Sequence, residues 1–158
     1  MRRGNGDIVT TEIIETDGTM ITAKVGNGCV YKRRIDSYAP AFSWKNCGGG
    51  TGKLEFNRFD SIFPLTVGSK AEYAYTGLNA NREPFEVTRR CTVDGTARIA
   101  VPAGNFETFH IVCQDGSWTR NYYYAPELGI DVRSDRSKNA GFQQDNYVNE
   151  LVSYSPIS

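Results

Sequence analysis

The sequence predicts an all-β protein of about ten antiparallel strands that follow one another in a meander, with little or no helix. Apolar and polar residues alternate over short segments such as 70–76 and 85–93, as in a sheet with one face toward solvent. Sixteen glycines and an aromatic content of 12% are typical of chains with many turns and half-buried strands. No apolar period of 3.6 residues persists for three helical turns. We therefore expect a barrel, a half-barrel or a sandwich.

Turn signals divide the first half of the chain. Asp17-Gly18 is a two-residue hairpin signal, and Ser37 to Pro40 separates a second pair of β-rich segments. The glycines at 48–50 and 52 lack the Lys-Ser or Lys-Thr of a phosphate-binding loop, so we expect a flexible loop there. Residues 57–68 are expected to connect two strands and to cap the core. The strands expected in this half cover residues 7–16, 19–25, 28–36, 41–47 and 53–56.

Residues 101–133 carry the densest strand and turn signals of the chain. Pro102-Ala103-Gly104 suits a tight reversal, because proline fixes φ and glycine can take a positive φ. Arg89 falls on the apolar face of its segment, so we expect it at a sheet edge or beside a register shift. The polar residues 134–146 are expected to form a mobile loop. The strands expected in this half cover residues 70–76, 85–93, 106–113, 118–124 and 147–155, with one more that ends near residue 133.

Length and charge limit the function classes. At 158 residues the chain fits a single β domain, residues 1–158, with residues 1–6 flexible. Eighteen basic and eighteen acidic residues leave no basic excess for binding nucleic acid. No apolar run is long enough to span a membrane, and the polar residues after Met1 do not form a signal peptide. No cofactor and no metal site are expected.

The first two of the four cysteines are expected to form a disulfide. Cys29 and Cys47 lie at equal distances along the chain from Tyr38, so a hairpin centred on Tyr38 places them opposite each other. Cys91 and Cys113 form the second expected disulfide. A hairpin that closes at Val101 and Phe106 leaves them three residues out of register, and a bulge at Asp94-Gly95-Thr96 would absorb this offset.

Each predicted disulfide closes about twenty residues and would contribute roughly 3 kcal/mol on the chain-entropy model. Four free thiols in a cytosolic protein are the alternative. Zinc is disfavoured because the cysteines are not closely paired and the chain has one histidine. Disulfides indicate export, so we expect a periplasmic or secreted protein whose signal peptide lies outside this sequence.

The string Val101-Pro-Ala-Gly-x-Phe-x-Thr, followed by a tyrosine-rich strand and Tyr124-Ala-Pro-Glu-Leu-Gly, resembles a pattern in exported bacterial proteins. These proteins form a domain family of unknown function, similar in plan to the curved antiparallel sheets of lipoprotein-carrier proteins. The resemblance covers roughly residues 65–154. It implies an envelope setting and a concave sheet that could hold an apolar or extended ligand. The four cysteines and the first sixty residues depart from this pattern.

An enzymatic function is disfavoured. A catalytic triad or a Cys-His site would have to use His110, which shares a strand face with Phe106, Thr108 and Val112. A histidine inside such a strand is more often a sheet residue than a catalyst. Disulfide formation would leave no thiol nucleophile. A glycan-processing enzyme that uses carboxylates stays open as an alternative.

A non-catalytic binding or interaction module of the bacterial envelope is the favoured function. The candidate binding residues alternate along one expected strand and therefore share a face; they are Trp118, Arg120, Tyr122 and Tyr124. Such a row could stack on sugars or hold an apolar ligand or peptide, unless this face is simply the core. The alternatives are an apolar-ligand or lipid carrier in a half-barrel and an accessory domain whose edge strands pair with a protein. The ligand or partner is unknown.

Overall fold

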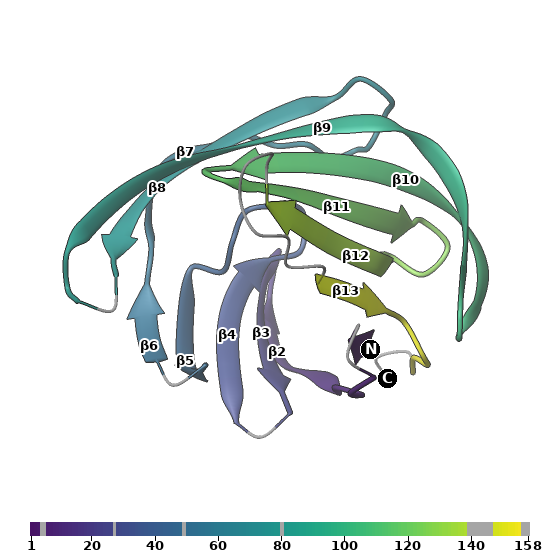
Figure 1. Ribbon diagram of the computed structural model, residues 1–158, viewed down its shortest axis with the longest axis horizontal. Coiled ribbons are helices and arrows are strands. Elements are labelled where there is room, and N and C mark those ends of the chain that lie inside the picture. Colours follow the sequence, from purple (N-terminus) through teal and green to yellow (C-terminus); the bar gives the residue numbers. More distant parts are fainter. Residues whose placement is uncertain (4–5, 27, 49, 80, 139–146, 156–158) are drawn as a thin grey trace. The chain divides into compact units, whose positions relative to one another are not determined.

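The structure is a computed structural model that describes residues 1–158 except for 4–5, 27, 49, 80, 139–146 and 156–158. Its described residues form thirteen strands in two antiparallel sheets (Figure 1) and contain no helix, so the predicted all-β class is confirmed. No described segment is a helix long and apolar enough to cross a membrane. Within each sheet the strands follow chain order, as predicted for a meander, and β1 is the exception.

The larger sheet has eight strands and an open order, in which the first and last strands do not pair with each other. Its strands, in spatial order, are β1 (Arg2–Arg3), β13 (Tyr147–Glu150), β12 (Ile130–Lys138), β11 (Trp118–Ala125), β10 (Gly104–Asp115), β9 (Pro84–Val101), β8 (Lys70–Leu78) and β7 (Glu55–Phe59).

The smaller sheet has five strands in chain order. These strands are β2 (Thr11–Asp17), β3 (Met20–Val25), β4 (Cys29–Arg34), β5 (Ser43–Cys47) and β6 (Gly50–Lys53). The turn that joins β2 to β3 needs a residue with positive φ, and Gly18 is that residue, with a φ of 61°.

The chain divides into two compact units. Unit 1 consists of Met1–Val9, Leu65–Lys70 and Cys91–Ser158, and unit 2 consists of Thr10–Pro64 and Ala71–Arg90. Two of the four boundaries between the units fall inside strands, after Lys70 in β8 and after Arg90 in β9, and the other two, after Val9 and after Pro64, lie between strands. The single domain that we predict for residues 1–158 stays a prediction.

In unit 1, β10 has buried residues on both of its faces, because the face that is buried changes along the strand. Phe106 and Thr108 are buried on one face, whereas Ile111 and Cys113 are fully buried on the other. The first face packs in a cluster that also contains Ala125, Val132 and Leu151. Because of this change of face, alternation of apolar and polar residues along β10 does not identify a single buried face.

Unit 2 is stabilised by aromatic side chains from β7, β8 and the residue before β5. The Phe42 ring lies 4.8 Å from the Phe56 ring, and the Phe59 ring lies 5.0 Å from the Tyr73 ring, measured between centroids. Tyr73 is fully buried, and its hydroxyl oxygen accepts a hydrogen bond of 3.3 Å from the backbone N–H of Tyr38. Pairs with this tilted geometry stabilise a core beyond the area they bury.

Arg89 belongs to this interior of unit 2 and not to an edge. It is only 5% exposed, and its Nη1 donates a hydrogen bond of 2.9 Å to the backbone carbonyl of Tyr38. Of the two alternatives, the edge position was wrong, because the buried Tyr38 carbonyl offers the guanidinium an acceptor inside the unit, and the register shift stays a prediction.

Three expectations about the chain segments are corrected. Arg2 and Arg3, expected to be flexible, pair with Glu150 and Asn149 of β13. The glycine-rich loop contains β6, and the expected connection after residue 56 begins with the end of β7. The polar segment expected to be a loop from residue 134 continues β12 as far as Lys138, and its remaining residues lie outside the described ones.

Both disulfides have the predicted partners. The register that brings Cys29 to Cys47 differs from the prediction, because Tyr31 lies opposite Trp44 and Asn46 takes a positive φ of 57° before Cys47. β10 begins at Gly104 and not at Phe106, so the second hairpin closes closer to Val101 than predicted. β9 includes residues 94–96, and the bulge that we expected there stays a prediction.

Candidate functional site

The four candidate residues all lie on β11, in unit 1, and all are partly buried. In the register of β10 and β11, Arg120 lies opposite Cys113 and Tyr122 lies opposite Ile111. Because opposite residues point to the same face, this face of β11 continues the fully buried face of β10. The candidate row is therefore the margin of the core, with its side chains half exposed.

Two cations lie over the ring of Trp118. The guanidinium carbon of Arg136 lies 4.5 Å from the ring centroid, and the Lys138 Nζ lies 5.2 Å from it. Both cations come from β12, where Lys138 lies directly opposite Trp118. Cation–π attraction of this kind contributes about 0.5–1 kcal/mol at exposed sites and holds the cations in place. Trp118 thus positions charge and is not a bare stacking surface.

Arg120 adds a third positive charge to this group. It lies directly opposite Arg136 on the neighbouring strand. Its Nε donates to the Asp115 carboxylate, with the Oδ2 atom 3.2 Å away, and Asp115 is only 6% exposed. We call Trp118, Arg120, Arg136, Lys138 and Asp115 the basic site. It carries three cations for one carboxylate.

The other two predicted residues lie outside this basic site. Tyr122 pairs with Ser134 of β12, next to Arg120 on the same face. Tyr124 lies at the far end of β11, beyond a register shift, where it is opposite Asp131. Burial and the nearby Asp131 carboxylate raise the pKa of the Tyr124 hydroxyl. The structure therefore brings Trp118 and Arg120 together and leaves Tyr124 apart.

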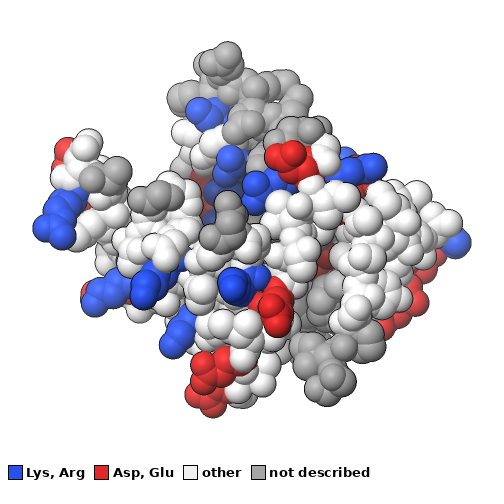
Figure 2. All heavy atoms as spheres, turned by 90° about the horizontal axis from the view of Figure 1, so that it is seen from below, with Lys and Arg blue, Asp and Glu red and all other residues white. Residues whose placement is uncertain are grey.

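Sequence reasoning missed Arg136 and Lys138 because it assigned residues 134–146 to a loop. The missed signal is the alternation of Ser134, Arg136 and Lys138, which continues the period of two residues of β12. The strand carries polar residues on both faces there, so hydropathy alone gives no sign of it. Figure 2 shows that both signs of charge occur on one face of the molecule.

The opposite face of β9–β12 carries a polar chain that includes the histidine. The Oδ1 atom of Asn121 lies 2.8 Å from His110 Nε2, and the Nδ2 of Asn121 donates to Asp135 Oδ1 at 2.8 Å. This amide orientation makes Nε2 the donor. The His110 ring also stacks on Tyr123 with 4.7 Å between centroids, and Asp94 lies 3.8 Å from its Nδ1. Each contact engages the ring across neighbouring strands.

In unit 2, two carboxylates share one arginine. The Arg58 guanidinium lies 3.1 Å from Asp60 Oδ2 and 3.0 Å from Glu72 Oε2. Its hydrogen bond, followed by one from the backbone N–H of Glu72, lowers the pKa of Asp60. A general acid needs the opposite shift, so Asp60 does not suit that role. Within the described residues, no three His, Cys, Asp or Glu side chains are grouped to hold a metal ion.

Comparison with protein-family models and with curated protein sequences gave no match. Comparison with solved structures matched the crystal structure of the hypothetical lipoprotein YmcC from Escherichia coli K12. The match has a TM-score of 0.60 and covers 99% of this chain and 83% of that chain, at 8% sequence identity. At this identity the likeness shows a shared fold. The family resemblance drawn from the strings at Val101 and Tyr124 remains a resemblance.

Proposed function

We propose that this chain is a non-catalytic binding module of the bacterial envelope, and that its basic site takes an anionic ligand. The envelope setting is supported by the two disulfides, which persist in oxidising compartments, and by the fold shared with a hypothetical lipoprotein. The ligand presents a phosphate or a carboxylate group, since these groups match the planar donors of arginine.

The observation that carries this proposal is the placement of Arg120 directly opposite Arg136, with Lys138 beside them. Like charges opposite each other on neighbouring strands destabilise a sheet. Asp115 offsets one of the three charges through Arg120. An anion bound between the strands would lessen the repulsion between Arg120 and Arg136, and the Trp118 ring keeps Arg136 and Lys138 in position for it.

A catalytic function has less support. His110 Nε2 carries a proton and donates it to Asn121, so this nitrogen cannot accept a proton from a hydroxyl as a general base. Asp60, beside Arg58, is held in its ionised form and does not suit proton donation. An apolar-ligand carrier also has less support, because the hollow at β4–β6 in unit 2 is open to solvent and encloses no ligand-sized interior.

The test follows Trp118 fluorescence in a Trp44→Phe background, so that one indole reports. The probes are an oligogalacturonate, an acidic peptidoglycan fragment and short-chain phosphatidylglycerol, with an uncharged chito-oligosaccharide for comparison. We expect an acidic probe to change the emission and the uncharged probe to leave it unchanged. Arg136→Glu combined with Lys138→Glu should weaken binding by more than about tenfold, since each charge-assisted hydrogen bond contributes about 1.5–3 kcal/mol.

Lys70→Glu is the matched control, because Lys70 is exposed on β8 and lies outside the basic site. It replaces one positive charge by a negative one, as each substitution in the double variant does, and should leave the affinity within about twofold of the parent. Equal affinity of the Arg136→Glu/Lys138→Glu variant and the parent for every acidic probe would refute the proposed site. A response to the uncharged oligosaccharide alone would refute the anionic ligand.

A further inference from the structure

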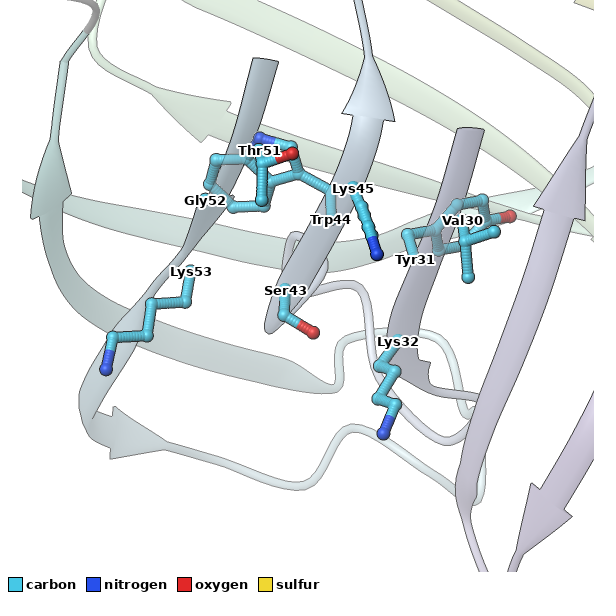
Figure 3. A pocket seen from close by; sticks show the side chains of 9 residues that line it. All are labelled: Val30, Tyr31, Lys32, Ser43, Trp44, Lys45, Thr51, Gly52 and Lys53. Carbon is cyan, nitrogen blue, oxygen red and sulfur yellow. The ribbon is translucent and has the colours of Figure 1, made fainter. Parts of the chain in front are cut away.

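The five-stranded sheet of unit 2 carries a second group of cations around an open hollow of about 500 Å³ (Figure 3). The hollow is formed by β4, β5 and β6. Nine residues line it: Val30, Tyr31, Lys32, Ser43, Trp44, Lys45, Thr51, Gly52 and Lys53. Three of them are lysines, three carry a hydroxyl group and none is a carboxylate.

The strand register places the three lysines on one face of the sheet. Lys32 lies opposite Ser43, and Ser43 lies opposite Lys53, so one row across three strands begins and ends with an ammonium group. Lys45 lies opposite Val30 in the neighbouring row of the same face. Figure 3 shows the Lys32 and Lys53 side chains extending to the same side of their strands. We call Lys32, Lys45 and Lys53 the lysine face.

The charges of the lysine face are not neutralised within the unit. All three side chains belong to exposed residues, and no ion pair found among the described residues includes one of them. The sheet carries its acidic residues on β2, at the opposite edge: Glu12, Glu15 and Asp17. Lys24 of β3 lies opposite Glu12, so it belongs to the mixed edge and not to the lysine face. Charge is therefore separated across the sheet.

The residue types fit a lipid surface better than a discrete small ligand. Lysine is a compact charge on a flexible stem, which suits phosphates that move laterally, whereas a fixed ligand is usually gripped by buried, oriented donors. Tyr31 lies opposite Trp44, one residue along each strand from the lysine row, so these two half-buried rings belong to the other face of the sheet and take no part in the lysine face.

We infer that the lysine face docks unit 2 on a bilayer that contains anionic phospholipid, with β4–β6 toward the headgroups and the acidic β2 edge away from them. The occupant is the phosphate layer of the membrane surface. This inference concerns a different unit and a different set of residues from the basic site, so it does not depend on the function proposed above.

The experiment measures co-sedimentation of the full chain with vesicles of phosphatidylcholine, either alone or with about 30% phosphatidylglycerol. Binding to the anionic vesicles is expected, and it should disappear at high salt because exposed charges are screened. Each lysine near an anionic surface adds about a fivefold gain in partitioning. Lys32→Glu/Lys45→Glu/Lys53→Glu should therefore reduce the partition coefficient by about a hundredfold or more.

Two further variants keep the test sharp. The neutral triple variant Lys32→Gln/Lys45→Gln/Lys53→Gln should also lose about a hundredfold without introducing repulsion. Lys70→Glu should bind like the parent, because it changes the net charge outside the lysine face. Near-ultraviolet circular dichroism checks that each variant is folded. We expect folded variants, because substitution of exposed lysines usually changes stability little.

Absence of binding to the anionic vesicles would overturn the inference, and so would unchanged binding of both triple variants. A soluble acidic polysaccharide serves as a second probe. If it binds through the same three lysines while the anionic vesicles do not bind, the face recognises a polyanion and the lipid assignment is wrong. Equal loss of vesicle binding in Lys70→Glu would reduce the effect to net charge and would also overturn it.

Discussion

The two disulfides close loops of similar length in different surroundings, one in each unit. Cys91 and Cys113 join β9 to β10 across 22 positions and are 1% and 0% exposed. Cys29 and Cys47 join the β4–β5 hairpin across 18 positions and are only partly buried. On chain entropy alone the two disulfides would contribute alike, roughly 3 kcal/mol each. Their surroundings make the difference.

In unit 1 the sulfur atoms are part of the packing. The buried pair lies among fully buried neighbours on the same strands, including Val93 and Ile111. In unit 2 the disulfide follows Asn46, whose positive φ and register shift mark an irregular hairpin end. The same covalent bond therefore fills a core in one unit and fixes an irregular turn in the other.

The largest expected effect separates these two roles. Cys91→Ala/Cys113→Ala should lower the free energy of unfolding by about 4–5 kcal/mol, because it loses both the loop constraint and buried side-chain volume. Cys29→Ala/Cys47→Ala should lower it by about 3 kcal/mol. Urea denaturation of the three proteins measures the difference. Equal losses would show that burial adds nothing to the Cys91–Cys113 bond.

A second prediction concerns unit 2, whose disulfide is only partly buried and whose interior contains the buried Arg89. Arg89→Ala should lower the free energy of unfolding by about 3 kcal/mol, because it opens a cavity and leaves the buried Tyr38 carbonyl without this charged donor. Arg90→Ala is the control. Its side chain is 69% exposed and pairs with Glu72 at 3.5 Å, so a loss below about 1 kcal/mol is expected. Similar losses for both variants would contradict the buried role of Arg89.

A third prediction tests the packing near the irregular hairpin. A methyl group on Gly52 would lie 2.6 Å from Cζ2 of Trp44, so Gly52→Ala should displace the ring and lower stability by about 1–2 kcal/mol. Gly95→Ala in β9 meets no atom within 4 Å and should be neutral or slightly stabilising, by less than about 1 kcal/mol. Thermal unfolding of both variants is the measurement. A neutral Gly52→Ala would mean that Trp44 is loosely held.

The smallest effect is a pH dependence. Burial raises the pKa of Tyr73 above its ordinary value, so the folded state keeps this proton where the unfolded chain loses it. Stability is therefore full below about pH 10 and declines as the pH rises toward the folded-state pKa. Tyr73→Phe should flatten this decline in urea titrations at alkaline pH. An unchanged slope would indicate that the burial of other tyrosines dominates.

Local pattern was enough for the fold class and for the disulfide partners. Alternation and turn residues depend on nearest neighbours, and cysteine pairing tolerates an error of one residue in register, as Cys29 and Cys47 show. The division into two sheets depends on contacts far apart in the sequence, such as Arg2 with Glu150, which alternation does not encode. Arg89 was misplaced for the same reason, since its acceptor lies on Tyr38.

The candidate site was predicted in part. The shared face of Trp118 and Arg120 follows from alternation along one strand. Its chemistry does not, because it depends on which strand lies alongside β11 and on the register that sets Arg136 opposite Arg120. The anion site that we propose therefore depends on the cations of the neighbouring strand, which the aromatic row on one strand does not reveal.

The unit boundaries inside β8 and β9 bear on how such a chain can evolve. β9 runs unbroken from Pro84 to Val101, and its first seven residues count with unit 2 while the rest count with unit 1. A gene segment cut at either boundary would end in the middle of a hydrogen-bonded ladder and expose unpaired strand edges. Exchange of one unit between proteins by recombination would therefore yield aggregation-prone products. We therefore expect the two units to be inherited together and to diverge by substitution.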